Sequence, residues 1–375
     1  MINYTIGTSS EYADLLDFGN YVFKIDFKEL LPKLYDGRED LAPYHFIAKE
    51  NDRIKAMVGC FPLTLQTGDQ LLKGMGIGTV SVHPYSRGQG HMKQLMKNAM
   101  SFIETEQADF AILSGQRQRY EYFGFTPTGS LIHLVVDKVN LKHKGITHST
   151  TDTLKSFDTL SQDDLQQISN WHHAKPLHSI RPLKDFVAIC KSWEAKPYAL
   201  YNDGILKGYM ILAGSNILDF YIEDTSLLGS FLSLILNKLD LDGVNLSIGL
   251  HDQENLKYLM SFAENYRMAT ATQLKIVNYQ NFIQAFLELK ASYEPLEKGK
   301  LILEIKDQVI LSIEVSDTIQ VSPTTHTPDI SLSHLEATHF ICDPVSFIPQ
   351  ELRSFSHIIH SWFPLPFSYC HTDNV

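Results

Sequence analysis

The 375-residue sequence contains little cysteine and no long hydrophobic run. Its four cysteines, Cys60, Cys190, Cys342 and Cys370, are scattered and form no Cys-x-x-Cys pair, which disfavours a disulfide framework or a zinc site. The stretch closest to a membrane span, residues 227–239, is interrupted by glycine, serine and asparagine and is shorter than the ~20 apolar residues that cross a bilayer. We therefore expect a cytoplasmic protein without a metal site or a membrane span.

The N-terminus also lacks the basic, apolar and small-residue segments of a signal peptide. Lys and Arg number 32 against 43 Asp and Glu, a net charge of −11, so the basic excess that nucleic acid requires is missing. An acidic surface can concentrate a cationic amine or simply maintain solubility, and composition leaves both open. The length exceeds one ordinary hydrophobic core and predicts two or three domains.

The first 137 residues have the mixed pattern of an α+β domain. Apolar residues at helical spacing predict a helix around residues 15–22. Strand patterns follow, then a glycine-rich loop, a helix and a short buried strand. The predicted strands are 45–49, 54–60, 63–66, 75–82 and 110–113, and the helix after the loop is 91–104.

The glycine-rich loop lies between a strand that ends in Val80-Ser-Val82 and an amphipathic helix that starts at His91. Its sequence is Arg87-Gly-Gln-Gly90. Glycines let several backbone N–H groups point toward one ligand, and the start of the helix adds partial positive charge. Arg87 supplies a fixed cation with several donors. The segment therefore predicts a cradle for a pyrophosphate, although its spacing matches neither a Walker loop nor the Rossmann fingerprint.

This segment resembles motif A of the GNAT superfamily of acyltransferases. The resemblance implies acetyl-CoA as cosubstrate, with the main chain of Val80, Ser81 and Val82 holding the pantetheine arm. It assigns the pyrophosphate to Arg87, Gly88, Gln89, Gly90, His91, Met92 and Lys93.

A second segment, Ser114-Gly115 followed by Tyr120-Glu-Tyr122-Phe-Gly-Phe125, resembles the part of GNAT enzymes that follows the next strand. In that family the tyrosine three residues before Phe-Gly lies beside the cofactor sulfur. An amine that attacks a thioester expels a thiolate, and a tyrosine hydroxyl can protonate it. The resemblance assigns this role to Tyr120 and the cofactor site to Ser114 and Gly115, whereas Tyr122 is interpreted as packing.

Residues 140–275 repeat the order strand, turn, helix, strand, with the helix at 227–239 and the last strand at 244–248. The turn here reads Glu223-Asp-Thr-Ser226. Two carboxylates repel a phosphate, so this half is predicted to bind no nucleotide.

The third stretch predicts a helix over 281–289, strands over 301–305 and 309–315, and a further helix near Ser331. The aromatic tail from Trp362 is too apolar to remain in water and is expected to dock.

The three-part layout resembles the enhanced-intracellular-survival (Eis) type of acetyltransferase. This resemblance implies a GNAT domain at 1–138, a degenerate GNAT-like domain at 139–275 and a sterol carrier protein-like domain at 276–375. It further implies acetylation of a primary amine, such as an aminoglycoside, a polyamine or a lysine side chain, by direct transfer without an acyl-enzyme. Homo-oligomers, including hexamers, are also implied.

In Eis-type enzymes the chain terminus returns to the active site and its α-carboxylate is the general base, which assigns that role to Val375. Asp373 could act instead, and Asp26 is a candidate anion for a cationic substrate. Two other functions stay open. The chain could be an acyl-CoA-binding sensor or assembly protein, or an aminoacyl-tRNA-dependent transferase, although the intact loop and acidic balance disfavour the latter.

Overall fold

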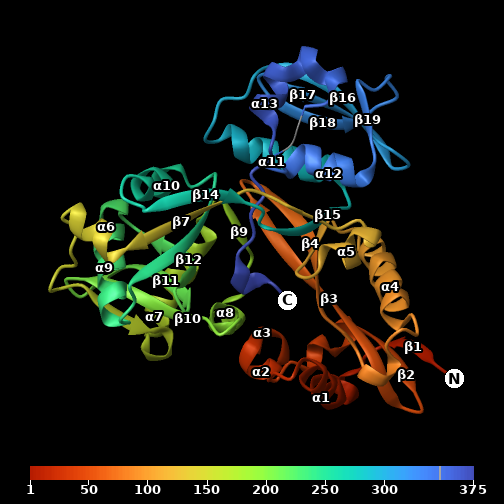
Figure 1. The fold of residues 1–375 in the computed structure, drawn as a ribbon, viewed down its shortest axis with the longest axis horizontal. Coiled ribbons are helices and arrows are strands. Elements are labelled where there is room, and N and C mark those ends of the chain that lie inside the picture. The colour runs from red at the N-terminus through yellow and green to blue at the C-terminus, as the bar shows by residue number, and fades with distance from the viewer. Residues whose placement is uncertain (346–347) are drawn as a thin grey trace. The chain divides into compact units, whose positions relative to one another are not determined.

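The computed structural model describes residues 1–345 and 348–375 and divides them into two compact units (Figure 1). Unit 1 consists of residues 1–129, 270–367 and 374–375. Unit 2 consists of residues 130–269 and 368–373.

Unit 1 begins with a largely antiparallel sheet of strand order β1-β2-β3-β4-β5-β15-β6. Only β4 and β5 are parallel neighbours in this order. The strands are β1 (Asn3–Ile6), β2 (His45–Glu50), β3 (Arg53–Thr67), β4 (Gln70–Val82), β5 (Phe110–Leu113), β6 (Thr126–Thr128) and β15 (Thr272–Ile276). The helices are α1 (Tyr12–Phe23), α2 (Phe27–Leu30), α3 (Pro32–Tyr35), α4 (His91–Thr105) and α5 (Arg117–Tyr120).

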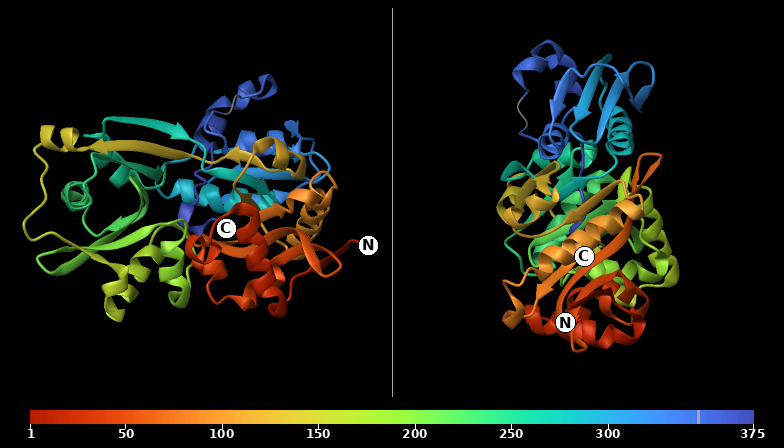
Figure 2. Two further views of the ribbon diagram at one scale, coloured as in Figure 1. Left: turned by 60° about the horizontal axis from the view of Figure 1, so that its bottom comes forward. Right: turned by 90° about the vertical axis from the view of Figure 1, so that its right-hand side faces the viewer.

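The predicted helix after the glycine-rich loop is confirmed as α4. Leu95, Met96, Ala99 and Ile103 have no exposed surface, and this face packs on β2 and β3 (Figure 2). The gap that we predicted between two strands at residues 61–62 is wrong, because β3 is continuous and Pro62 pairs with Met75 of β4.

A second, four-stranded sheet of unit 1 has the order β18-β17-β16-β19. Its elements are α11 (Tyr279–Ala291), β16 (Gly299–Ile305), β17 (Val309–Val315), β18 (Ile319–Pro323), β19 (Ile330–Leu332), α12 (His334–Cys342) and α13 (Ser356–Trp362). Helix α12 begins at a capping box, in which Ser333 and Glu336 satisfy each other's backbone N–H groups.

The aromatic part of the tail docks as predicted. Trp362 has no exposed surface, and its indole N–H donates to the Glu297 carbonyl at 2.8 Å. The ring of Phe367 lies among three others at centroid distances of 6.1, 5.7 and 5.6 Å; these belong to Phe110, Phe282 and Phe286. Aromatic pairs in this range add to the stability from burial.

Unit 2 is built on a seven-stranded sheet of order β14-β7-β13-β12-β11-β10-β8. The strands of this sheet are β7 (Leu131–Asp137), β8 (Thr153–Ser156), β10 (Lys196–Asn202), β11 (Ile205–Ala213), β12 (Asn216–Ile222), β13 (Gly243–Gly249) and β14 (Asn265–Ala269). The short strand β9 (Leu177–Ser179) also lies in unit 2 but is not part of this sheet. The helices are α6 (Lys138–His143), α7 (Gln162–His173), α8 (Leu183–Lys191), α9 (Leu228–Lys238) and α10 (Gln253–Met260).

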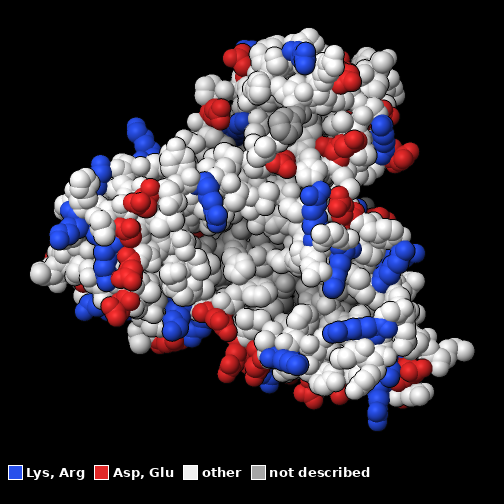
Figure 3. All heavy atoms as spheres, viewed as in Figure 1, with Lys and Arg blue, Asp and Glu red and all other residues white. Residues whose placement is uncertain are grey.

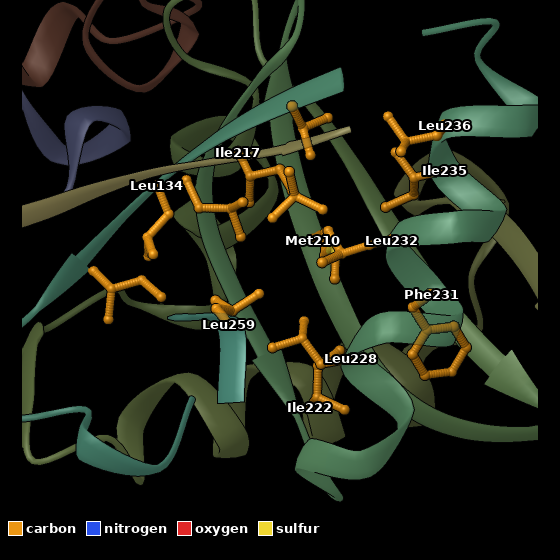
Figure 4. Close-up of a cluster of buried hydrophobic side chains, with 14 of the residues drawn as sticks. Leu134, Met210, Ile217, Ile222, Leu228, Phe231, Leu232, Ile235, Leu236 and Leu259 are labelled. Carbon is orange, nitrogen blue, oxygen red and sulfur yellow. The ribbon is translucent and has the colours of Figure 1, made fainter. Parts of the chain in front are cut away.

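The core of unit 2 lies between α9 and this sheet (Figure 4). Phe231, Leu232 and Ile235 of α9 are fully buried, and Leu134 and Met210 face them from the strands. Each such side chain contributes about 1.5–3 kcal/mol through burial. This core explains why the apolar run at 227–239 is an internal helix.

Two strands lie in sheets that the sequence order does not suggest. β7 belongs to unit 2, where it pairs with β13 and β14. β15 belongs to unit 1, where it is inserted between β5 and β6. The first sheet is therefore completed by a strand more than 140 residues beyond β6.

Candidate functional site

The glycine-rich loop follows β4 through a short 3-10 turn, Pro84–Ser86. Gly88 and Gly90 have φ values of +78° and +82°, and a Cβ atom on either would meet no atom within 4 Å. Positive φ favours glycine, and the open space leaves room for a ligand close to the main chain. Gly90 is the N-cap of α4 and provides no side-chain cap. The first N–H groups of a 15-residue helix are thus left for an external acceptor.

Side chains around the loop hold it in shape. The Tyr4 hydroxyl lies 2.9 Å from Nδ1 of His91, and Nε2 of His91 lies 3.2 Å from Oε1 of Gln89. His91 is 4% exposed, so its ring is engaged by Tyr4 and Gln89 inside the protein. Arg87 is exposed and forms no hydrogen bond or ion pair with any described residue.

The other cation near the loop is also at the surface. The ammonium of Lys93 lies 4.4 Å from the centroid of the Tyr122 ring. It lowers the pKa of the Tyr122 hydroxyl, chiefly through a hydrogen bond. On the face drawn in Figure 3, Lys and Arg side chains lie among Asp and Glu. A phosphate at the loop would therefore depend on local cations such as Arg87.

β4 and β5 separate after Ile77, before β4 reaches the loop. Their parallel register runs from Gly74–Phe110 to Ile77–Leu113, and β5 ends there. The following residues of β4, Val80, Ser81 and Val82, extend beyond the last pair. An opening between parallel strands offers main-chain groups to an extended ligand, much as a neighbouring strand would. This is where the predicted pantetheine-binding residues lie.

A bulge in β4 marks the start of this opening. Thr79 has φ +47°, a left-handed conformation that is strained for a β-branched residue. Its hydroxyl accepts a hydrogen bond of 3.1 Å from buried Tyr35, and the same Tyr35 hydroxyl lies 3.0 Å from Nε2 of His45. Burial lowers the pKa of His45 to about 4, so this imidazole is neutral. This network could not be predicted from the sequence, because nothing in the spacing of Tyr35, His45 and Thr79 indicates that they meet.

Tyr120 lies at the end of α5 and is 8% exposed. Its ring packs against Gly115, where a Cβ atom would lie 2.6 Å from Cε2 of Tyr120. Burial raises the pKa of the Tyr120 hydroxyl, which keeps it protonated at neutral pH. The structure thus brings together two predicted residues, Tyr120 and Gly115. Ser114 beside them is exposed.

Val375 lies against the same stretch of β4. A Cβ atom on Gly76 would be 2.6 Å from Cγ2 of Val375, and one on Gly78 would be 2.6 Å from its carboxyl carbon. Only glycine at these positions leaves room for the chain end. The alternation of Gly74, Gly76 and Gly78 along one strand face is the sequence signal that indicates such a close approach.

Two further residues have local roles. Asp26 is exposed, and its carboxylate caps α2 by accepting from the Lys28 N–H at 2.9 Å. Both oxygens of the Asp373 carboxylate accept from Arg181 at 2.8 Å. The Asp373 carboxylate thus belongs to an ion pair with Arg181, and its role as a base in place of the terminal carboxylate stays a prediction.

The N-terminal part of this geometry has known relatives. Residues 3–128 match the sequence profile of the acetyltransferase (GNAT) domain family. The chain carries a GNAT acetyltransferase domain. The match covers the loop, the opening in β4 and Tyr120, and acetyltransferases of this type use an acyl-CoA cosubstrate. No curated protein sequence matches the chain.

Solved structures share the fold over the full length. A probable N-acyltransferase from Enterococcus faecalis is 14% identical, with all of both chains covered and a TM-score of 0.69. A GCN5-related N-acetyltransferase from Kribbella flavida is 12% identical, covers 100% of this chain and 98% of its own, and has a TM-score of 0.71. Eis1 from Mycobacterium abscessus is 14% identical, with both chains fully covered and a TM-score of 0.62. At these identities the likeness shows a shared fold.

Two features of other protein classes are not found. Within residues 1–345 and 348–375, no helix is long and apolar enough to cross a membrane. The same residues contain no cluster of three or more His, Cys, Asp or Glu that could hold a metal ion.

Proposed function

We propose that the protein transfers the acetyl group of acetyl-CoA directly to a primary amine, as an Eis-type N-acetyltransferase. The observation that carries the proposal is the position of Val375, whose carboxyl carbon lies against Gly78 where β4 separates from β5. A carboxylate at that point can receive a proton next to the place where an extended pantetheine arm would run.

The cosubstrate fits the loop residue by residue. The backbone of Gly88 to Lys93 at the uncapped start of α4 would bind the pyrophosphate, with Arg87 as its counter-ion. Val80, Ser81 and Val82 would hold the pantetheine arm. Backbone N–H groups at the bulge in β4 would polarise the thioester carbonyl.

The proposed reaction uses two groups, a carboxylate that accepts a proton and a tyrosine that donates one. The Val375 α-carboxylate accepts a proton from the acceptor ammonium, and the freed amine forms a C–N bond to the thioester carbon. As the C–S bond breaks, Tyr120 donates its proton to the thiolate. The nitrogen then loses its second proton, which restores the Tyr120 hydroxyl. Tyr120 starts in the required state, because burial raises the pKa of its hydroxyl and keeps it protonated at neutral pH.

The domain assignment is part of this proposal. Unit 2 has the β12–α9–β13 order of a GNAT fold with an acidic turn, so we assign it as a degenerate GNAT-like domain. The α11–α13 region with its four-stranded sheet is assigned as sterol carrier protein-like. Asp26 is a candidate contact for a cationic acceptor, and assembly as a homo-oligomer such as a hexamer follows from the Eis-type assignment.

The test is release of free thiol from acetyl-CoA in the presence of aminoglycosides, polyamines and lysine peptides. Amine-dependent release, with the acetylated product identified by mass, supports the proposal. Tight CoA binding without release for any amine class would favour an acyl-CoA sensor instead.

A further inference from the structure

The last residues before Val375 are held inside unit 2. The Ser368 hydroxyl lies 2.9 Å from the position of a Cβ atom on Gly249, at the end of β13. The Cys370 thiol donates to the Leu218 carbonyl of β12 at 3.5 Å. The segment 368–373, which we call the tail segment, therefore contacts both β12 and β13.

These contacts lie where the two strands diverge. β12 and β13 are parallel and pair only at Asn216–Asn245 and Ile217–Leu246. Leu218 and Gly249 both come after the last pair. The parallel strands β4 and β5 of unit 1 also separate after a short register. In unit 2 the corresponding opening contains the chain's own tail segment.

A buried ionic cluster fixes the end of the tail segment. The Arg181 side chain has no exposed surface. Its Nε and Nη2 atoms donate to the two oxygens of Asp373 at 2.8 Å each, and Nη2 also donates to the Thr372 hydroxyl at 3.0 Å. Its Nη1 atom donates to Asp219 at 3.1 Å, and Asp219 pairs with Lys175 as well.

The cluster is balanced, with two cations and two carboxylates. Burial alone would raise the pKa of Asp219, but Lys175, His172 and Arg181 together hold it well below its usual range. A bidentate pair between guanidinium and carboxylate fixes distance and orientation. A tail that only packed on the surface would not need a buried, charge-balanced cluster of this kind.

We infer that Arg181 is a positioning residue for the reaction: by fixing Asp373 and Thr372 in unit 2, it sets the place of Val375, two residues further along the chain. The inference rests on the proposed role of Val375 as the base. Asn374 and Val375 belong to unit 1, so the restraint passes through one short covalent link. Without it, the terminal residues would regain conformational freedom and the carboxylate would spend less time at Gly78.

The test must remove the restraint without leaving a buried charge unpaired, since an uncompensated buried ion is strongly destabilising. The double variant Arg181→Met with Asp373→Asn removes one cation and one anion and leaves the Lys175–Asp219 pair. We expect kcat to fall about 10- to 100-fold, with KM for acetyl-CoA and the melting temperature nearly unchanged. The difference in kcat between the double variant and the unchanged protein should become smaller as pH rises from 7 to 9, because a deprotonated amine needs no base.

A second readout does not depend on turnover. Carboxypeptidase should release Val375 from the double variant at least several-fold faster than from the unchanged protein. The matched control is Lys207→Met with Glu223→Gln, which removes a partly exposed ion pair of the same unit. It should alter neither carboxypeptidase release nor kcat.

Arg181→Lys provides a second test if the double variant folds poorly. It keeps the charge but loses the bidentate geometry, and an intermediate loss of kcat with faster release of Val375 supports the inference. Unchanged kcat in a folded double or lysine variant overturns it.

Deletion of Asn374 and Val375 separates this inference from the proposed function. Full turnover after the deletion would refute Val375 as the base, and with it the inference. Loss of turnover after the deletion, combined with unchanged kcat in the Arg181 variants, would overturn only the positioning role.

Discussion

The β4–α4 turn of unit 1 and the β12–α9 turn of unit 2 join similar elements but have opposite chemistry. Each lies between a strand and a helix, and the strand that follows is parallel to the first. In unit 1 the helix begins at Gly90 without a side-chain cap. In unit 2 the Asp224 carboxylate accepts from the Ser226 N–H at 2.9 Å, in the 3-10 turn that leads into α9.

This difference shows how little is needed to convert a phosphate site into a closed turn. A helix start attracts an anion, and unit 2 supplies that anion from its own chain. The hydrogen bonds from Ser226 lower the pKa of Asp224, which stays ionised. Neighbouring Glu223 pairs with Lys207 at 2.8 Å. A bound phosphate would meet two carboxylates here and none at Gly90.

The largest expected effect concerns the tyrosine that follows each second strand. Tyr120→Phe removes the proton donor, so we expect kcat to fall about 10²- to 10⁴-fold while the affinity for CoA is unchanged. In unit 2 the Tyr258 hydroxyl lies on the turn, 3.5 Å from the Ser226 carbonyl. Tyr258→Phe should therefore leave kcat unchanged. Steady-state kinetics and calorimetric CoA binding measure both, and equal activity of Tyr120→Phe would refute the donor role.

The second-largest expected effect comes from placing an acidic residue in the corresponding turn of unit 1. Gly90→Asp places a carboxylate at the start of α4, and aspartate tolerates positive φ better than most residues. Like charges about 4 Å apart near a protein surface repel by roughly 4 kcal/mol, so CoA affinity should fall on the order of 100-fold or more. Gly145→Asp, at another open glycine of positive φ in unit 2, is the control and should bind CoA normally.

A third test compares the acid stability of the units. Burial lowers the pKa of His45 and His334 in unit 1, and of His172 and His251 in unit 2, to about 4 each. A histidine with a depressed folded pKa binds its proton more readily when unfolded, so stability is lost as pH falls from about 6.5 to about 4. Each group contributes up to about 1.4 kcal/mol per pH unit. Urea unfolding at pH 7.5, 6 and 5 measures this slope.

His251→Gln should reduce the dependence of stability on pH by the contribution of one histidine. A stability that is flat across this pH window would contradict the assignment of these histidines as buried and neutral.

The smallest effect is the loss of the cap in unit 2. Asp224→Ala should lower the free energy of unfolding slightly, because the Ser226 N–H loses its acceptor at the 3-10 turn before α9. CoA affinity should not change, since unit 1 alone provides the cradle. Thermal unfolding and calorimetry test the two parts. A gain in CoA binding to a second site would mean that the acidic turn alone excludes the nucleotide.

The β4–α4 segment could be predicted from sequence because its signals are local. The strand pattern over residues 75–82, the glycines of the loop and the amphipathic helix follow one another directly. Together they define one supersecondary unit. The tail was predicted to dock because Trp362 and Phe367 are too apolar for solvent. Its aromatic partners, however, come from distant strands and helices, which the apolar pattern does not specify.

Other features could be recognised only from the folded structure. Arg181 and Asp373 are 192 residues apart, and no periodicity connects two single charged residues at that distance. The sequence also placed residues 131–137 in the first domain, because a local pattern does not specify which sheet a segment joins. The bulge at Thr79 was hidden as well, since a β-branched residue is not typical of positive φ.

The position of β15 has a consequence during synthesis. β5 and β6 are translated by Thr128, but the strand between them begins only at Thr272. At about 5–20 residues per second, the ribosome needs roughly 7–30 s to make the intervening chain. Until then β5 and β6 are nascent edges with unpaired backbone groups, a form prone to aggregate. The GNAT domain is therefore expected to mature late and to rely on chaperones, and fragments cut near residue 138 should be poorly soluble.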